Sequence, residues 1–427
     1  MKKHIKLLVV LGIILVGSFS FYLFKGFKKD TLVYENNKIK PSSSGIAMML
    51  ETSAGSGNYE MTTRSEWPTD GYVFNANLSK CENGSELSWD NENKKVLMSG
   101  NKSDKCYVYF DVEIPPTIAN TCTSGTNLAS CIKTYSNKGS SVSNIYHHDG
   151  SLENGINDNS YRFAGASDAV NNYVCFGSTT TPCPADNLYR IIGVFGNQVK
   201  LIKYDYATSA LLGTDGEYAS TGTPNASYYK GSLTTINEYY WNTSTRTNTW
   251  SESLLNKTNL NTNFINNIGT EWANKIATTT WKVGGNTYAN IYLKTPSVAY
   301  QNEIVNPVTT NTTDNATEYS AKIGLMYVSD YGFGADPSAW TTTLYNYDGS
   351  VNGSTIRSLN WMHMGSDDWT ISRNAGISDA AFGVYGGGSV NYYRVGDDFA
   401  VRPSFNLESS ITYVSGSGSA SDPMVIN

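Results

Sequence analysis

The chain has 427 residues, of which 16% are charged and 40% are hydrophobic. This composition excludes a disordered tail and leaves room for two or three domains. The first thirty residues carry six of the 31 Lys and Arg but only one of the 37 Asp and Glu, so the remainder has a formal charge of 25 minus 36, or −11. That acidic balance argues against a partner bound by phosphate neutralisation, such as nucleic acid.

An apolar run opens the chain. Residues 7–24 contain no charged side chain, and as a helix they would span about 27 Å, close to the roughly 30 Å of a bilayer core. Lysines stand on both sides, so charge does not set the orientation. We expect residues 1–30 to be a cytoplasmic tip and an uncleaved signal anchor in the cell membrane, single-pass, with the C-terminal bulk extracellular. The alternative is a signal peptide cleaved near Ser18-Phe19-Ser20, although the apolar run continues past that site.

Six cysteines follow the apolar run. Their local spacing predicts three disulfides, which is one choice among fifteen connectivities. No Cys-x-x-Cys spacing exists, which disfavours zinc, and disulfides imply an oxidising exterior. The expected pairs are Cys81 with Cys106, Cys122 with Cys131, and Cys175 with Cys183.

The middle of the chain divides by composition. Residues 31–57 are polar and rich in Ser and Gly, which predicts a spacer. Residues 58–116 contain short alternating runs, with a turn at 90–93, and predict a small all-β sandwich domain pinned by Cys81 and Cys106. Pro115-Pro116 marks a boundary. Residues 117–158 are expected to be a disulfide-stapled connector with a short helix near 127–135.

Residues 159–427 predict a mixed domain of antiparallel strands and short helices. It opens with two apolar strands about the two-residue turn Gly196-Asn197. Thr249-x-x-Glu252 has the form of a capping box, and apolar residues at spacings of four follow it. The segment 321–332, "AKIGLMYVSDYG", is expected to add a buried strand. The fold class is therefore α+β: a transmembrane helix, a small all-β sandwich and a mixed domain.

Five short motifs occur in a set order: "LYRIIGVFGNQVKLIKYD", "TWSESLLNKTNLNTNF", "KIGLMYVSDYG", "DWTISR" and "AVRPSFNL". This succession resembles a widespread domain of unknown function in extracellular proteins of gram-positive gut bacteria and covers roughly residues 159–410. The closing "VRPSFNL" also resembles the end of the C-type-lectin-like fold shared by diversified ligand-binding proteins and formylglycine-generating enzymes. The resemblance implies that fold for residues 159–427, but fold alone does not give function.

Catalytic and metal chemistry find little support. The formylglycine-type activity depends on late cysteines, and the chain has none after Cys183. The sugar-binding triplets of C-type lectins, Glu-Pro-Asn, Gln-Pro-Asp and Trp-Asn-Asp, are absent from the sequence. No nucleophile elbow occurs, and His147-His148 is expected to be a loop. We expect no enzyme, metal or cofactor; the alternatives are a carboxylate-dependent enzyme, and calcium on Asp367-Asp368 and Asp397-Asp398.

The stretch from Asn360 to Leu407 places aromatic residues among turn-forming glycines, a pattern typical of exposed binding loops. Exposed rings cost solubility unless they meet a partner. We therefore expect a membrane-anchored extracellular recognition or adhesion protein that binds glycan or protein, with a structural or assembly component of the cell envelope as the alternative. The expected ligand-binding residues are Trp361, Trp369, Arg373, Tyr385, Asn391, Tyr392, Tyr393 and Arg394.

Overall fold

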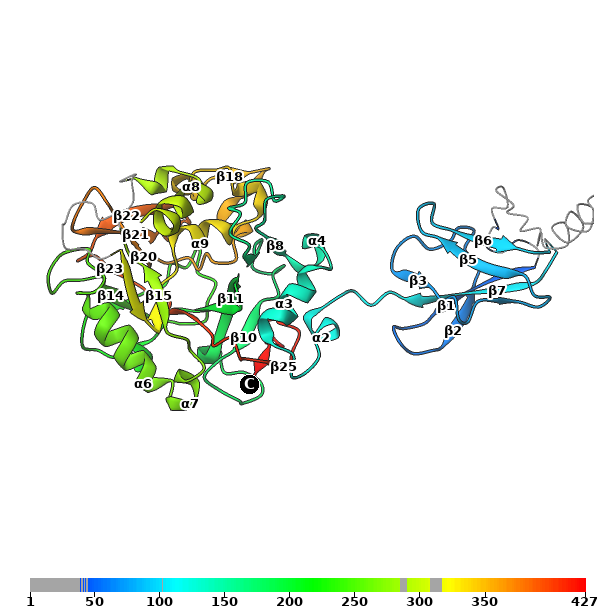
Figure 1. The fold of residues 1–427 in the computed structure, drawn as a ribbon, viewed down its shortest axis with the longest axis horizontal. Coiled ribbons are helices and arrows are strands. Elements are labelled where there is room, and N and C mark those ends of the chain that lie inside the picture. The colour runs from blue at the N-terminus through cyan, green and yellow to red at the C-terminus, as the bar shows by residue number, and fades with distance from the viewer. Residues whose placement is uncertain are drawn as a thin grey trace, which may run out of the picture. The chain divides into compact units, whose positions relative to one another are not determined.

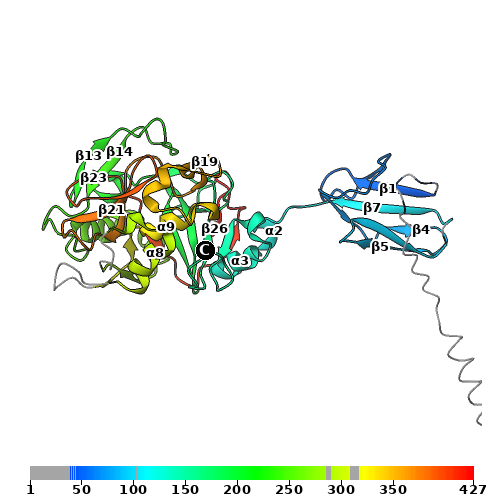
Figure 2. The same cartoon turned by 90° about the horizontal axis from the view of Figure 1, so that it is seen from above.

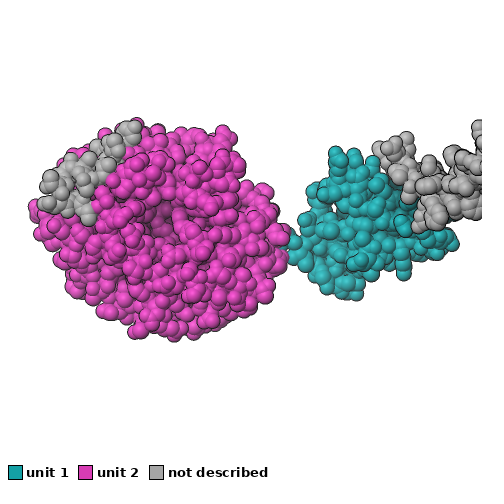
Figure 3. All heavy atoms as spheres, in the orientation of Figure 1, with its two compact units in different colours: residues 1–115 teal, residues 116–427 magenta. Residues whose placement is uncertain are grey.

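The computed structural model describes residues 39, 41, 43, 45–101, 103–284, 290–307 and 317–427. The chain forms two compact units, Met1–Pro115 and Pro116–Asn427, shown in separate colours in Figure 3. The fold is mixed α and β, with many antiparallel sheets and few helices. The apolar run 7–24 lies outside the described residues, and none of the helices within them is both long and apolar enough to cross a membrane.

The first unit is built on a five-stranded sheet of order β2-β1-β7-β3, with β4 also paired to β7. The strands are β1 (Ile46–Glu51), β2 (Tyr59–Thr62), β3 (Tyr72–Phe74), β4 (Lys80–Cys81) and β7 (Cys106–Val112). β1 pairs with β7 in parallel, from Ile46 opposite Cys106 to Leu50 opposite Phe110. The expectation of a spacer that runs to residue 57 is therefore wrong for β1, because its alternating apolar residues bury one face in this sheet.

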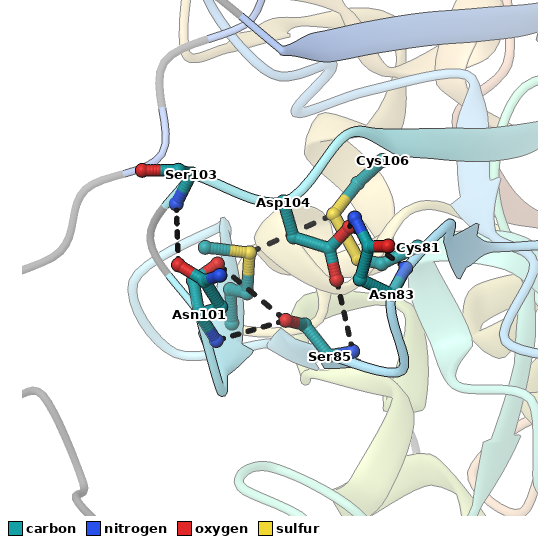
Figure 4. The surroundings of a disulfide bond; sticks show 8 residues. Cys81, Asn83, Ser85, Asn101, Ser103, Asp104 and Cys106 are labelled. Carbon is teal, nitrogen blue, oxygen red and sulfur yellow. Dashed lines mark hydrogen bonds between the residues drawn. A yellow bond between two sulfur atoms is a disulfide. The ribbon is translucent and has the colours of Figure 1, made fainter.

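The core of the first unit is small and apolar. The hairpin of β5 (Glu86–Asp90) and β6 (Lys95–Ser99) adds Trp89, whose ring meets Phe110 edge-on at 5.5 Å. The predicted disulfide Cys81–Cys106 is present and closes one side of this unit. Beside it, in Figure 4, the Asp104 carboxylate accepts hydrogen bonds from the amide N–H groups of Asn83 and Ser85 at 2.9 and 3.1 Å.

The second unit is centred on a seven-stranded sheet of order β17-β24-β12-β11-β9-β8, with β10 also paired to β11. Every pairing in it is antiparallel. The predicted two-residue turn Gly196-Asn197 is confirmed, since Phe195 lies opposite Gln198. The strands are β8 (Ile145–His147), β9 (Tyr161–Phe163), β10 (Tyr173–Cys175), β11 (Leu188–Phe195), β12 (Gln198–Lys203), β17 (Ile323–Gly324) and β24 (Ser404–Asn406).

Smaller sheets surround this one. The closing sheet contains β20 (Asp368–Arg373), β21 (Ala380–Val384) and β22 (Val390–Arg394), and a second three-stranded sheet contains β13 (Tyr218–Gly222), β14 (Ile236–Tyr240) and β23 (Asp398–Phe399). The two-stranded pairs are β15 (Thr279–Lys282) with β16 (Glu318–Ala321), β18 (Ser350–Val351) with β19 (Ser354–Thr355), and β25 (Tyr413–Ser415) with β26 (Val425–Ile426).

The helices are short. Those of the α type are α2 (Ile118–Thr121), α3 (Leu128–Ser136), α4 (Ser140–Ser143), α5 (Ser209–Leu212), α6 (Ile265–Asn267), α7 (Thr270–Ala273), α8 (Pro296–Tyr300) and α9 (Val328–Phe333). Two segments, η2 (Leu255–Phe264) and η4 (Gln301–Val305), are π-helical. The 3-10 turns are η1 (Ala185–Asn187), η3 (Ile291–Leu293), η5 (Pro337–Ala339), η6 (Leu344–Asp348) and η7 (Ile356–Leu359). Figures 1 and 2 both show α8 beside α9.

The segment expected as a connector is part of the second unit. Its helix α3 is confirmed, and the Asn127 side chain caps it by accepting from the Ser130 amide at 3.1 Å. Leu128 and Ile132 are buried in the main core. Because the Leu128 amide also donates to the Ile411 carbonyl at 2.9 Å, this helix joins the end of the chain. The disulfides Cys122–Cys131 and Cys175–Cys183 are present as predicted.

Two local predictions are wrong. The helical block begins at Leu254 rather than after Thr249, and its first turn is fixed by the Ser253 hydroxyl, which accepts from the Asn256 amide at 3.3 Å. Residues 321–332 provide only the two-residue strand β17 before helix α9. That helix starts where the Asp330 carboxylate turns back to accept from the Tyr327 amide at 3.0 Å. In this second segment a local carboxylate cap therefore outweighed the apolar pattern.

Candidate ligand-binding sites

Trp361 and Trp369 belong to the core and not to a binding face. Trp361 is 1% exposed, and its indole N–H donates to the Phe163 carbonyl at 2.8 Å. Trp369 is fully buried, donates to the Tyr239 carbonyl at 2.8 Å and stacks on Phe399 at 4.4 Å. These interactions satisfy each ring's only donor and cover its faces. The expectation that the two rings are exposed is wrong.

Arg373 is buried as well, at 2% exposure. Its Nε–H donates to the Val283 carbonyl at 3.2 Å, and burial lowers the pKa of its guanidinium to about 10. The reason is common to this region, since every residue of β20 is buried. Trp369 and Arg373, which we expected in exposed loops, therefore lie on a buried strand.

Tyr392 and Tyr393, which we expected in one site, point to opposite sides of the closing sheet. Tyr392 and Tyr393 are neighbours on β22, so their side chains leave opposite faces of the strand. Tyr393 turns inward, with its ring 4.5 Å from Phe399. Asn391 shares that face, and its side-chain oxygen accepts from the Tyr392 amide at 2.9 Å. One contiguous site holding all eight expected residues is therefore not formed.

A smaller group of the expected residues does reach the surface. Tyr385 is 49% exposed at the tip of the β21–β22 hairpin, whose turn contains Gly386, Gly387 and Gly388. Tyr392 lies 5.9 Å from the ring of Tyr292, which in turn lies 5.7 Å from Tyr345, itself 46% exposed. Gly387 and Gly388 of the hairpin turn pack against η6, the turn that carries Tyr345. We call Tyr292, Tyr345, Tyr385 and Tyr392 the tyrosine surface.

The hydroxyl groups of the tyrosine surface have no hydrogen-bond partner among the described residues. They are free to bond with a ligand or with water. Arg394, the last expected residue, lies on the same face of β22 as Tyr392 and pairs with Asp379. Sequence reasoning missed Tyr292 and Tyr345, because they lie on the separate 3-10 turns η3 and η6.

The acidic pairs considered for calcium are engaged within the chain. Asp368 receives the Arg402 Nε–H at 2.6 Å, and Asp367 accepts from the Gly386 amide at 2.7 Å. Asp397 accepts from the Arg394 amide at 2.9 Å. In the part of the chain that the structure describes, no three His, Cys, Asp or Glu side chains come together to hold a metal ion.

A row of polar residues crosses the main sheet, a feature the sequence analysis did not anticipate. Arg162 on β9, Gly193 on β11, Lys200 on β12 and Asn406 on β24 are successive partners across four strands. Partners directly opposite each other share one face of the sheet. The glycine is required, since a Cβ there would lie 2.4 Å from the Tyr161 carbonyl oxygen. Arg162, Lys200 and Asn406 line a cavity of about 210 Å³.

The charges in this row are paired. Asp330 of α9 receives Lys200 at 2.5 Å through one oxygen and Arg162 at 3.1 Å through the other. Arg162 also reaches Asp158 at 3.0 Å. Burial raises the pKa of Asp330, but the charges of Lys200 and Arg162 outweigh it and hold that pKa below its ordinary value. The network is thus two cations with two carboxylates.

A third carboxylate lies behind the cavity. Glu303 accepts from the amides of Val328 and Ser329 at 3.1 and 3.0 Å and from the Ser372 hydroxyl. Burial raises its pKa to about 7 despite these donors. Glu303 therefore holds the first turn of α9, and with it Asp330, in place.

Comparison with known proteins found no matching family model, no matching curated protein and no matching solved structure.

Proposed function

We propose that the protein is an extracellular recognition protein, anchored by residues 1–30, whose second unit binds a glycan on the tyrosine surface. The observation that carries this proposal is the tyrosine surface, whose hydroxyl groups have no partner among the described residues. The ring of Tyr292 lies 5.7 Å from that of Tyr345 and 5.9 Å from that of Tyr392, and Tyr345 and Tyr385 are about half exposed. A tyrosine ring offers an apolar face for stacking and a hydroxyl for directed hydrogen bonds. Both are suited to a sugar, whose rings carry C–H faces between hydroxyl groups.

The three disulfides support an extracellular location, because such bonds persist in oxidising compartments. The resemblance of the motifs to an extracellular domain of gut bacteria points the same way, and so does the similarity of the last strand to the C-type-lectin-like fold.

A glycan array probed with the purified full-length protein tests the proposal. We expect binding to a subset of glycans, weakened up to about tenfold by Tyr345→Ala, because a stacked ring adds roughly 0.5 to 1.5 kcal/mol. The matched control is Tyr107→Ala, which removes a tyrosine of similar exposure, 39%, from β7 of the first unit. Glycan binding that survives removal of both Tyr345 and Tyr385 would contradict the proposal.

The second candidate is an assembly component of the envelope, whose tyrosine surface meets another copy or a wall partner. It is favoured by the same exposed rings, which also suit a protein interface. Light scattering over a range of protein concentrations separates the two. Self-association that Tyr345→Ala abolishes supports assembly, whereas a constant mass together with glycan binding supports recognition.

A further inference from the structure

We infer that the cavity over the polar row of the main sheet is a binding pocket for a single neutral sugar residue. It uses none of the four tyrosines of the tyrosine surface, so the inference stands whether or not the proposed function is correct. Three features carry it: the size and walls of the cavity, its balanced charge, and a buried oxygen that has no partner among the described residues.

The walls are aromatic. Phe195, Trp281, Tyr300 and Tyr327 line the cavity together with the polar row. At about 210 Å³ it is smaller than the roughly 300 Å³ at which pockets for drug-sized ligands begin, so it suits one ring and not a chain. Apolar walls with a few convergent polar groups are the usual make-up of a small-molecule site.

Cations already stack on several of these rings. The Lys200 ammonium lies 4.6 Å from the Tyr327 centroid and 5.3 Å from that of Trp281, and the Arg162 guanidinium lies 4.6 Å from Phe195. The rings therefore hold the cations over the sheet, and Asp330 fixes them from the other side. A pocket whose polar groups are fixed before the ligand arrives loses less entropy on binding.

The charge in the pocket is balanced, which selects against ionic ligands. Arg162 and Lys200 face Asp158 and Asp330, while Lys282 at the wall pairs with Glu318. An anion or a cation that entered would add a charge without a partner and would give up part of its hydration, which is costly. A neutral ligand meets no such cost.

The side chain of Asn406 indicates which hydrogen-bonding groups a ligand of this pocket needs. Its amide N–H donates to the Thr279 hydroxyl at 3.0 Å, but its side-chain oxygen is buried and has no partner among the described residues. The ammonium of its strand neighbour Lys200 has three donors, and among the described residues Asp330 is its one hydrogen-bond acceptor. A ligand that donates to Asn406 and accepts from Lys200 satisfies both, and neighbouring sugar hydroxyls do this.

Ligand-observed NMR and tryptophan fluorescence on the full-length protein test the inference. The probes are glucose, galactose, mannose and N-acetylglucosamine, with glucuronic acid and glucosamine as the charged counterparts, each to about 10 mM. We expect at least one neutral sugar to bind more tightly than both charged ones. Its fluorescence response should disappear in Trp281→Phe, because that indole forms part of the wall.

Asn406→Ala is the main variant. It should weaken binding of the neutral sugar about tenfold or more, while stability changes little, because the lost bond to Thr279 is offset by removal of an unpartnered buried oxygen. Asn91→Ala, in an exposed turn of the first unit, is the matched control. Tighter binding of a charged sugar, absence of binding by every neutral sugar, or unchanged binding in Asn406→Ala would overturn the inference.

Tyr345→Ala separates this inference from the proposed function. A cavity ligand should bind the Tyr345→Ala protein as it binds the unmodified chain, whereas a glycan on the tyrosine surface should not. Loss of monosaccharide binding in Tyr345→Ala with retention in Asn406→Ala would place the sugar on the tyrosine surface and overturn the cavity assignment.

Discussion

The two units satisfy their buried charges in different ways. The first has a small apolar core, built on residues such as Met48 and Val108, and its buried carboxylates are held by backbone amides: Glu51 accepts from Gly57 and Val112, and Asp104 from Asn83 and Ser85. The second unit instead buries ion pairs, with Asp330 bonded to Lys200 and Arg162 inside a much larger apolar core. Burying both partners of an ion pair carries a large desolvation cost, which a large core can offset more readily than a small one.

The largest expected effect tests how far this core extends into the closing sheet. Trp369→Ala should destabilise the second unit by about 3 to 5 kcal/mol, the usual cost of emptying a buried tryptophan site. Tyr385→Ala, in the same sheet but exposed, should stay within about 0.5 kcal/mol. Denaturant unfolding followed by fluorescence measures both. If the two variants lose similar free energies of unfolding, Trp369 is not more deeply buried than Tyr385, and the placement of the closing sheet is wrong.

The next effect concerns the disulfide of the first unit. Replacing Cys81 and Cys106 together by alanine opens a loop of 25 residues, which in the chain-entropy estimate costs about 3.5 kcal/mol. Calorimetry should show the transition of the first unit moving down while that of the second stays in place. Peptide mapping of the unreduced protein is the control, and a pairing such as Cys106 with Cys131 would contradict the connectivity.

A smaller, pH-dependent effect belongs to the second unit. His148 is fully buried between Phe333 and Trp340, and neither ring nitrogen has a hydrogen-bond partner among the described residues. Burial lowers its pKa to about 3. In the unfolded chain the imidazole of His148 takes up a proton as the pH falls through about 6.5, whereas in the folded chain it stays neutral down to about pH 3. Stability from His148 is thus fully present above about pH 6.5 and declines as the pH falls toward 3.

The measurement compares His148→Phe with the unmodified chain at pH 7.5 and pH 5. Between these values the unmodified chain should lose about 2 kcal/mol that the variant keeps. Other groups also titrate in this range, among them Glu303, whose raised pKa works in the opposite direction. Only the difference between the two proteins is therefore informative, and equal losses would show that His148 is not held neutral.

Local signals in the sequence predicted local structure well. The turns at Gly196-Asn197 and at 90–93, the helix α3 and the three disulfides all depend on residues close together in the chain. Burial in the closing sheet could not be predicted in the same way. Whether Trp369 faces solvent depends on Phe399 and on the Tyr239 carbonyl, which other strands bring to it.

The polar row could not be predicted either, because its members lie between residues 162 and 406 and meet only through strand register. A weak signal existed. Lys200 stands between the apolar residues Val199 and Leu201, and Arg162 between Tyr161 and Phe163. A charged residue inside a buried strand requires a partner, but the sequence alone does not say which acidic residue supplies it.

The parallel pairing of β1 with β7 has a mechanical consequence. The chain enters β1 at Ile46 and leaves β7 at Val112, so entry and exit lie at opposite ends of the same strand pair. A pull along the chain therefore loads the hydrogen bonds between these strands in shear, and all five paired positions must yield together instead of unzipping one at a time. The first unit is built to resist tension between whatever holds its two ends.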